Sequence, residues 1–280
     1  MNKTLAIFEL MRLDKPIGIY LLLWPALLAL VISSNGNFEY VDLIIVIIGS
    51  ILVRSAGCVI NDIWDKDLDG GVERTKTRPI PSKKLSISES WVVFAVLGIL
   101  SLMLLSLTNV NTILISICFG LMIVVYPLTK RFFIGPQIFL GLTFNPTIIV
   151  YAMTNELNNP TMIFLYLAIA AKTIAFDSFY GLCDMEDDKK LGINSTPLWW
   201  GSKTLLIIAI LQFAVISFLL IVGLKAELSS AWYIGIILLS GFYFYQHQLA
   251  SQKNFLLAFK NNHWASLYLL TLSVFCFLII

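Results

Sequence analysis

Charged residues are scarce in this sequence. Asp, Glu, Lys and Arg make up 13% of its 280 residues, whereas a soluble domain carries about a quarter. Hydrophobic residues account for 58%, and several apolar runs approach or exceed the roughly 18 residues that a helix needs to cross a bilayer. The composition therefore predicts an all-α integral membrane protein and excludes an ordinary soluble enzyme. The net charge of +2 is too small to identify a partner.

Cysteine and histidine are also scarce. The four cysteines lie far apart in or beside apolar runs, which indicates small buried side chains and not a disulfide framework. His247 and His263 have no third metal ligand nearby, so a zinc site is not expected. The chain also lacks a glycine-rich nucleotide loop, a Ser–His–Asp arrangement, a nucleic-acid module and a cleavable N-terminal leader. The first apolar run is expected to be retained as a helix.

Nine apolar segments are predicted to be transmembrane helices of a single domain, residues 1–280. They cover residues 17–34, 42–61, 90–108, 111–128, 136–154, 161–179, 203–223, 230–249 and 262–280. Asn145 and Pro146 interrupt the fifth segment, where proline frees a backbone carbonyl; the break forms either a simple kink or the wall of a cavity. Four tryptophans near helix ends are interpreted as interfacial anchors: Trp199, Trp200, Trp232 and Trp264.

The distribution of positive charge predicts the orientation of the chain. All Lys and Arg residues except Lys172 and Lys225 lie on one side of the nine segments, or at the helix ends on that side. Because positively charged loops stay in the cytoplasm, the N-terminus is predicted to be cytoplasmic and the C-terminus outside. Lys172 lies inside the sixth segment, where it either pairs with a carboxylate or extends to the interface.

An acidic cluster follows the second apolar segment. Asp62, Asp65 and Asp69 are spaced at i, i+3 and i+7, so on a helix they share one face. Neighbouring carboxylates repel one another and need a cation. Carboxylate oxygens and the Asn61 amide are hard ligands that suit Mg²⁺, which usually shares its coordination with water and substrate phosphates. The first hypothesis is therefore a Mg²⁺–phosphate site.

A second acidic cluster lies at the end of the sixth segment. Asp177, Asp184 and Asp188 again share one helical face, together with Tyr180. A single cluster of this kind is more often the solvated end of a helix. Four crossings separate the two clusters, so both emerge on the same side and are predicted to form two halves of one site. Carboxylates facing lipid would be too costly, so they must line a polar cavity at the cytoplasmic end of the bundle.

Basic residues surround the first cluster. The long connection over residues 62–89 carries Arg74, Lys76 and Arg78 directly after the acids, and Lys130 and Arg131 follow the fourth segment. An ordinary positive-inside loop explains many such residues. Alternatively, some of them bind diphosphate oxygens that a metal leaves uncovered.

Arg54 is a stronger candidate for diphosphate binding, because it lies inside the apolar run before the cluster. A buried arginine needs a partner or a function. Arg54 and Asp62 are eight residues apart, which is about two helical turns, so they lie on a similar face.

The two clusters resemble the aspartate-rich motifs of the UbiA-type intramembrane prenyltransferases. The first motif, Asn-Asp-x-x-Asp-x-x-x-Asp, is matched by Asn61, Asp62, Asp65 and Asp69, and the second by Asp184 and Asp188. Further stretches look like those of the 4-hydroxybenzoate polyprenyltransferases within this family: residues 11–18, Trp24-Pro25, 69–82, Lys130-Arg131 and 192–196. The resemblance extends from about residue 10 to about residue 265.

The resemblance implies nine transmembrane helices around a central cavity that opens at the cytoplasmic face of a bacterial inner membrane. It also implies two Mg²⁺ ions that bridge a polyprenyl diphosphate to the protein. Metal ligands are expected at Asn61, Asp62, Asp65, Asp69, Asp184 and Asp188. Catalytic residues are expected at Asp65, Asp69, Asp177, Asp184 and Asp188. Substrate-binding residues are expected at Arg54, Arg78, Lys130, Arg131, Tyr180 and Lys190.

The implied reaction joins the polyprenyl group to the ring carbon ortho to the hydroxyl of 4-hydroxybenzoate, an early membrane step of ubiquinone biosynthesis. The expected partners are the two substrates and the lipid bilayer, without nucleic acid. A family member with a haem, chlorophyllide or naphthoate acceptor is one alternative. A cation transporter is another, because carboxylates in membrane segments also mark ion pathways; acids on one face beside a basic loop favour an anionic substrate instead.

Overall fold

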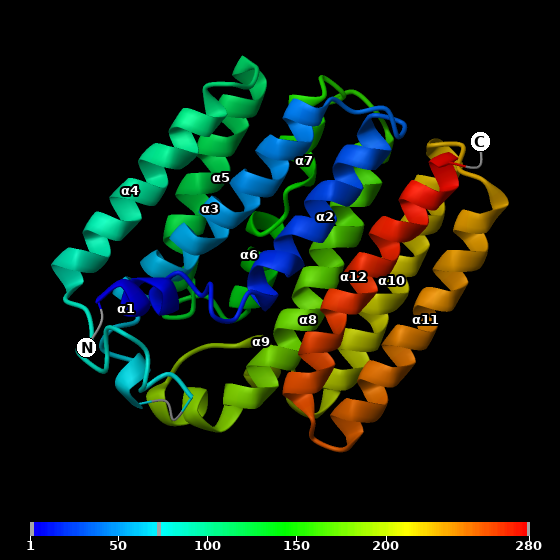
Figure 1. Cartoon of the computed structure of the whole chain (residues 1–280). Helices are drawn as coiled ribbons and strands as arrows, with labels where there is room; N and C mark the ends of the chain where they lie inside the picture. Colours follow the sequence, from blue (N-terminus) through cyan, green and yellow to red (C-terminus); the bar gives the residue numbers. More distant parts are fainter. Residues whose placement is uncertain (1–2, 72–73, 279–280) are drawn as a thin grey trace.

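The computed structural model describes residues 3–71 and 74–278, and α-helices dominate this part of the chain (Figure 1). The helices are α1 (Lys3–Leu10), α2 (Ile17–Ser33), α3 (Tyr40–Trp64), α4 (Ile87–Leu105), α5 (Val110–Thr129), α6 (Pro136–Thr143), α7 (Thr147–Met153), α8 (Thr161–Leu191), α9 (Thr196–Trp200), α10 (Thr204–Lys225), α11 (Ser230–Ser251) and α12 (Phe255–Leu278). Two short 3₁₀ turns, η1 (Asp69–Gly71) and η2 (Gly201–Lys203), complete the regular structure. No strand occurs in these residues, so the all-α prediction is confirmed for them.

The long helix α8 lies at the centre of the bundle. It packs against α10 and α12 on one side and α6 on the other, while α2 joins α3 to α12 (Figure 1). One large apolar core runs through α2, α7, α8, α10, α11 and α12. The helix α4 is peripheral and packs on α3. The short helix α1 packs near the C-terminal end of α3 through Ala6 and Leu10. The second half of the chain is therefore densely packed around α8.

Five helices of the described chain are long and apolar enough to cross a membrane. They are α3, α4, α5, α8 and the segment Thr196–Lys225 that contains α10. Each of the nine predicted segments coincides with helical structure, although residues 279 and 280 of the last segment lie outside the described residues. The multi-pass character therefore agrees with the structure, while nine crossings remain a prediction.

The predicted break in the fifth segment separates α6 from α7. Asn145 holds the break in place, because its amide donates to the Tyr166 carbonyl at 2.9 Å and its side-chain oxygen accepts from the Thr147 amide at 3.2 Å. Both Asn145 and Pro146 line a cavity. The break is thus part of a cavity wall, which was one of the two alternatives.

The contacts of two residues in the predicted transmembrane segments, Lys172 and Trp232, differ from those expected. Lys172 is 2% exposed and neither pairs with a carboxylate nor extends to the interface; it donates to the Ser266 hydroxyl on α12. Trp232 is not an interfacial anchor, because its ring is fully buried and its N–H donates to the Leu219 carbonyl at 2.9 Å. Neighbouring helices supply both partners, so the sequence around each residue carries no sign of them.

Gly223 makes room for Trp232. A Cβ atom at this position would lie 2.3 Å from Cδ1 of the indole ring. We expect Gly223→Val to displace the ring and to destabilise the protein by about 1–3 kcal/mol, as overpacked cores do. Thermal unfolding of the protein in detergent measures this effect. Gly241→Val is the matched control, since nothing lies within 4 Å of its Cβ position; equal destabilisation by both variants would contradict the packing argument.

Candidate active site

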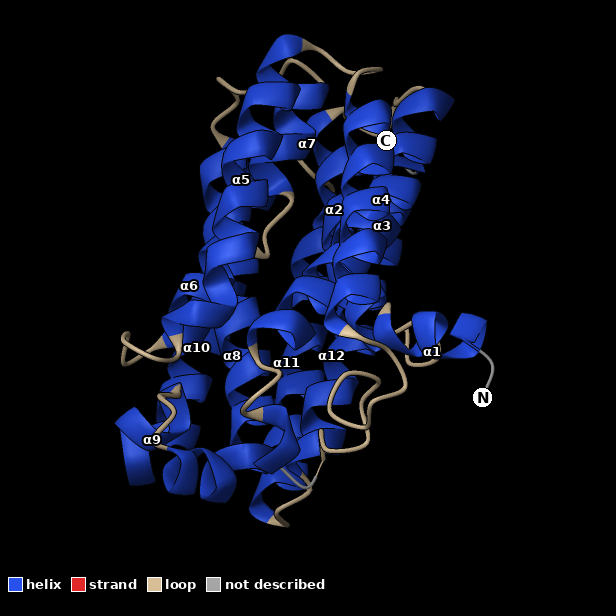
Figure 2. Ribbon diagram, turned by 90° about the vertical axis from the view of Figure 1, so that its left-hand side faces the viewer, coloured by secondary structure: helices blue, strands red, loops and turns tan. Residues whose placement is uncertain are grey.

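A cavity of about 1410 Å³ reaches the end of the bundle that carries the basic loop. Its walls come from α2, α3, α4, α5, α6 and α8, and residues of the loop after α3 close its floor. Figure 2 shows α5 and α6 standing apart from α2, α3 and α4. Residues from all five of these helices line the cavity. Both acidic clusters line this one cavity.

The first cluster does not lie on one continuous helix. The helix α3 ends at Trp64, and Asp65 caps it. The chain nevertheless keeps turning, since the Asp65 amide donates to the Asn61 carbonyl at 2.9 Å and the Asp69 amide to the Asp65 carbonyl at 2.8 Å. Asp62, Asp65 and Asp69 therefore still face the cavity, and they are only 1%, 1% and 6% exposed. The prediction that the three aspartates share one face of a continuous helix was wrong. The prediction that their side chains lie together was correct, because all three line the cavity.

Each buried carboxylate of the first cluster has a basic partner. Asp62 binds Arg12 at 2.8 Å and Arg78 at 3.1 Å. Asp69 binds the same Arg78 at 2.7 Å, and Asp65 binds Lys130. Within residues 3–71 and 74–278, no three acidic, histidine or cysteine side chains are grouped closely enough to form a ready-made metal site. The basic groups thus provide the neutralising charge that the sequence assigned to a metal.

Asp65 shows where a cation fits. Its Oδ2 accepts from Lys130 and from the Asn61 amide at 3.0 Å, whereas its Oδ1 is buried without a hydrogen-bond partner. Burial raises the pKa of the Asp65 carboxyl above its ordinary value, and the Lys130 ammonium opposes that rise. A buried acceptor without a donor is costly, and a hard divalent cation beside Oδ1 would satisfy it.

The second cluster lies inside α8, which continues well beyond the predicted end at residue 179 and stops at Gly192 in the left-handed conformation. Asp177, Tyr180, Asp184 and Asp188 line the cavity from this helix. The loop after α3 reaches them through Arg74, whose guanidinium binds both oxygens of Asp184 and lies 4.6 Å from the centre of the Tyr180 ring. One arginine therefore ties the two halves of the site together.

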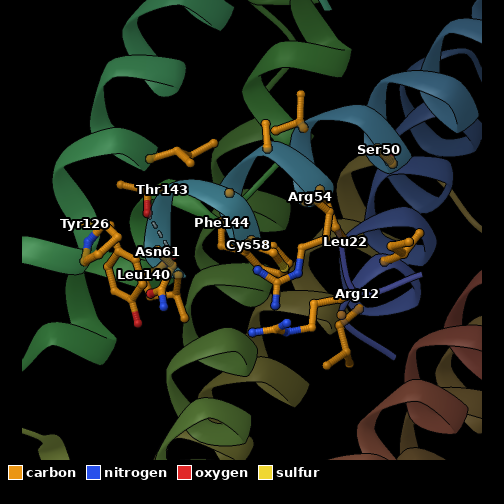
Figure 3. A pocket seen from close by; sticks show the side chains of 18 of the residues that line it. Arg12, Leu22, Ser50, Arg54, Cys58, Asn61, Tyr126, Leu140, Thr143 and Phe144 are labelled. Carbon is orange, nitrogen blue, oxygen red and sulfur yellow. Dashed lines mark hydrogen bonds between the residues drawn. The ribbon is translucent and has the colours of Figure 1, made fainter. Parts of the chain in front are cut away.

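Arg54 points into the cavity from α3, as Figure 3 shows, beside the guanidinium of Arg12. Its Nε is buried without a hydrogen-bond partner, and its guanidinium carbon lies 5.2 Å from the centre of the Phe144 ring. Gly18 leaves the necessary space, because a Cβ there would lie 2.5 Å from that Nε. Arg54 is thus a buried cation whose remaining hydrogen-bonding capacity faces the cavity.

Two predicted substrate-binding residues lie outside the cavity. Arg131 donates to the backbone carbonyl of Trp64 at 2.5 Å, and the exposed Lys190 pairs with Asp187 at 3.5 Å. Conversely, Arg12 lies in the site although it was not among the candidates. Its signal was present in the sequence as part of the motif over residues 11–18, but nothing in that stretch shows that it reaches Asp62.

The Lys130–Asp65 pair offers a test of the site's electrostatics. We expect Lys130→Met to destabilise the protein by about 3 kcal/mol, because a buried carboxylate loses its cation. Lys190→Met removes an exposed pair and should cost less than about 1 kcal/mol. Thermal unfolding compares them. The double variant Lys130→Met/Asp65→Asn should recover stability; if it is no more stable than Lys130→Met, the lost charge pair is not the cause.

Comparisons with known proteins agree with this architecture. Residues 22–278 match the model of the UbiA prenyltransferase family. The chain is 40% identical over 265 residues to a 4-hydroxybenzoate octaprenyltransferase of Pseudomonas aeruginosa, covering 92% of this chain and 89% of that protein. It is 39% identical over 272 residues to a 4-hydroxybenzoate octaprenyltransferase of Vibrio campbellii, covering 95% of each.

Solved structures share the fold at low sequence identity. The apo structure of a UbiA homologue from Aeropyrum pernix has a TM-score of 0.80 at 20% identity, covering 90% of this chain and 94% of that one. A UbiA homologue from Archaeoglobus fulgidus, bound to GPP and Mg²⁺, has a TM-score of 0.75 at 18% identity, covering 98% of this chain and all of that one.

Proposed function

The chain belongs to the UbiA prenyltransferase family, and from that premise we propose that it transfers a polyprenyl group from polyprenyl diphosphate to 4-hydroxybenzoate. The prenyl group joins the ring carbon ortho to the hydroxyl, in an early step of ubiquinone biosynthesis. We propose this acceptor because two relatives that are about 40% identical over nearly the whole chain are 4-hydroxybenzoate octaprenyltransferases. The observation that carries the chemistry is the meeting of two acidic clusters and several cations in one cavity with apolar walls.

Divalent metal use is consistent with the Mg²⁺-bound homologue, and the residues of this chain fit the ion. We assign Asp65 and Asp69 from the first half, Asp184 and Asp188 from the second, and the Asn61 amide to two Mg²⁺ ions. The unpartnered Oδ1 of Asp65 supports this assignment. When bound, the metal neutralises diphosphate charge and lowers the cost of breaking the C1–O bond.

The cations of the cavity bind the rest of the diphosphate. Arg78 and Lys130 neutralise Asp69 and Asp65. If those carboxylates held a metal, both basic side chains would be available to bind diphosphate oxygens. Arg54 and Tyr180 line the same space and are assigned to the substrates. Arg131 and Lys190 lie outside the cavity and receive no such role.

The reaction then follows from charge and from exclusion of water. As the diphosphate departs, positive charge develops on the allylic carbon, and the electron-rich ring carbon of the acceptor attacks it. A cavity with little water protects the cation from hydrolysis. A base must finally remove the ring proton. Asp184 is assigned to the metal, so we assign the base to Asp177, which lines the cavity deeper in α8.

We place the whole chain, residues 1–280, in a bacterial inner membrane as one multi-pass domain of nine crossings. The N-terminus and the charged floor of the cavity face the cytoplasm, and the C-terminus lies outside. The clustering of basic side chains at the acidic end of the bundle supports this orientation.

Product formation tests the function directly. Purified protein in lipid is supplied with 4-hydroxybenzoate and octaprenyl diphosphate, with Mg²⁺ or with EDTA, and the product is identified by mass spectrometry. We expect prenylated 4-hydroxybenzoate with Mg²⁺ and none with EDTA. Prenylation of a naphthoate but not of 4-hydroxybenzoate would contradict the acceptor, and product in EDTA would contradict the metal.

The prenyl chain is assigned to a slot between α4 and α5. These two helices do not pack along their length in the described structure, and one face of each lines the cavity. Gly98 on α4 and Gly120 on α5 lie in that lining, and a Cβ at either position would have no atom within 4 Å. Long donors can therefore extend sideways through the slot into lipid.

Filling the slot should discriminate between donors by length. We expect Gly120→Leu to lower kcat/KM for octaprenyl diphosphate roughly tenfold, because the added side chain occupies the path of the chain. Geranyl diphosphate, which ends closer to the diphosphate, should be affected much less. Gly241→Leu, at an exposed position of α11 with no atom within 4 Å of its Cβ position, is the control. Equal losses with both donors would show that the slot does not hold the chain.

A further inference from the structure

Asp62 differs from Asp65 in that both of its carboxylate oxygens accept hydrogen bonds from arginine side chains. The Nη2 of Arg12 lies 2.8 Å from each of its oxygens, and the Nη1 of Arg78 lies 3.1 Å from Oδ1. The carboxylate is 1% exposed. Neither oxygen lacks a donor, in contrast to Oδ1 of Asp65, which is buried and unpartnered. The contacts of Asp62 are therefore those of a counterion for two arginines.

The turn after α1 determines where the Arg12 side chain lies. Its φ of 58° lies in the left-handed region, which side chains with a Cβ rarely adopt. The backbone amide of Arg12 donates to the Glu9 carbonyl at 3.1 Å and its Nη1 donates to the same carbonyl at 2.9 Å, so the side chain reinforces the turn after α1. Helices commonly end with a residue in this conformation, and the contact with Glu9 fixes the direction in which the Arg12 side chain leaves α1. The turn delivers the guanidinium from outside the bundle to the cavity.

Charge explains why two arginines can share this position. Arg12 and Arg78 both line the cavity and would repel one another without an anion between them. Asp62 supplies one negative charge for the two, so the three side chains together remain positive. If Asp69 turns to a metal, Arg78 keeps its contact with Asp62. The group then presents a fixed positive surface to an anion at the floor of the cavity.

We propose that Arg12 is a further diphosphate-binding residue and that Asp62 positions Arg12 and Arg78 for this task, and is not a metal ligand. This rests on the diphosphate donor proposed above, but not on the identity of the acceptor. The apolar packing of Ala6 and Leu10 against Val59 and Ile63 holds α1 on the bundle independently. Loss of the Arg12–Asp62 contact should therefore leave the fold intact.

Binding without turnover tests the proposal in the full chain, reconstituted in lipid nanodiscs. Mn²⁺, which accepts the same oxygen ligands as Mg²⁺, is counted by electron paramagnetic resonance at saturating inorganic diphosphate. Calorimetry gives the Kd for inorganic diphosphate in the presence of Mn²⁺. The variants are Asp62→Asn, Arg12→Gln and Asp65→Asn. Lys3→Gln is the control, because it removes the exposed 2.5 Å pair between α1 and Glu89 on α4.

We expect Asp62→Asn and Arg12→Gln to bind as much Mn²⁺ as the parent chain but to raise the Kd for diphosphate at least tenfold. Asp65→Asn should lose bound Mn²⁺, and Lys3→Gln should change neither quantity. Loss of Mn²⁺ in Asp62→Asn would make Asp62 a metal ligand and overturn the proposal. An unchanged Kd in Arg12→Gln would overturn it as well.

Arg12→Lys is the second variant, because it keeps the charge without the guanidinium fork. We expect its Kd to lie between those of the parent and Arg12→Gln, with an unchanged unfolding temperature. These readouts do not depend on prenyl transfer, so an inactive enzyme with 4-hydroxybenzoate leaves them valid.

Discussion

Neutralisation of buried carboxylates is the constraint on which the rest of this structure depends. An apolar bundle cannot hold several carboxylates without cations, because isolated charge in a low-dielectric medium is prohibitively costly. Arg12, Arg74, Arg78 and Lys130 supply that charge, and three of them come from segments outside the long helices. The ion pairs with these acids therefore hold the connecting segments against the end of the bundle. The site and the fold of its floor are consequences of the same electrostatic requirement.

The two halves of the molecule solve different packing problems. Around α8, α10, α11 and α12, glycines admit large side chains, and buried amides of Gln212 and Gln246 join α10 to α11 at 2.8 Å. Around α3, α4 and α5, helices touch fewer neighbours and line open space. A dense half can hold Asp177 and Asp184 in place while the open half admits a long flexible molecule. The helices packed around α8 thus fix the acidic side chains, whereas α3, α4 and α5 leave space for the substrate.

Much of this arrangement was predictable from the sequence, for identifiable reasons. Apolar runs report helix positions because lipid and core impose the same composition on a helix, and the spacing of Asp177, Asp184 and Asp188 reports a shared face because α8 is continuous there. The first cluster was harder, since α3 ends at Trp64 and a turn, not a helix, aligns Asp69. The position of Arg12 depends on a contact fifty residues away, which no local pattern records. For the same reason, nothing near Lys172 indicated its partner Ser266.

The slot between α4 and α5 also bears on how the proposed reaction ends. The transfer converts an amphiphilic donor and a small aromatic acid into two products with opposite solubilities, a free diphosphate and a prenylated aromatic acid with a hydrocarbon tail. The charged floor of the cavity lies toward the loops, whereas the proposed slot lies between α4 and α5. Each product therefore leaves toward the phase in which it dissolves. Release then needs no step in which hydrocarbon crosses water or a highly charged anion crosses lipid, because the two products leave by separate routes.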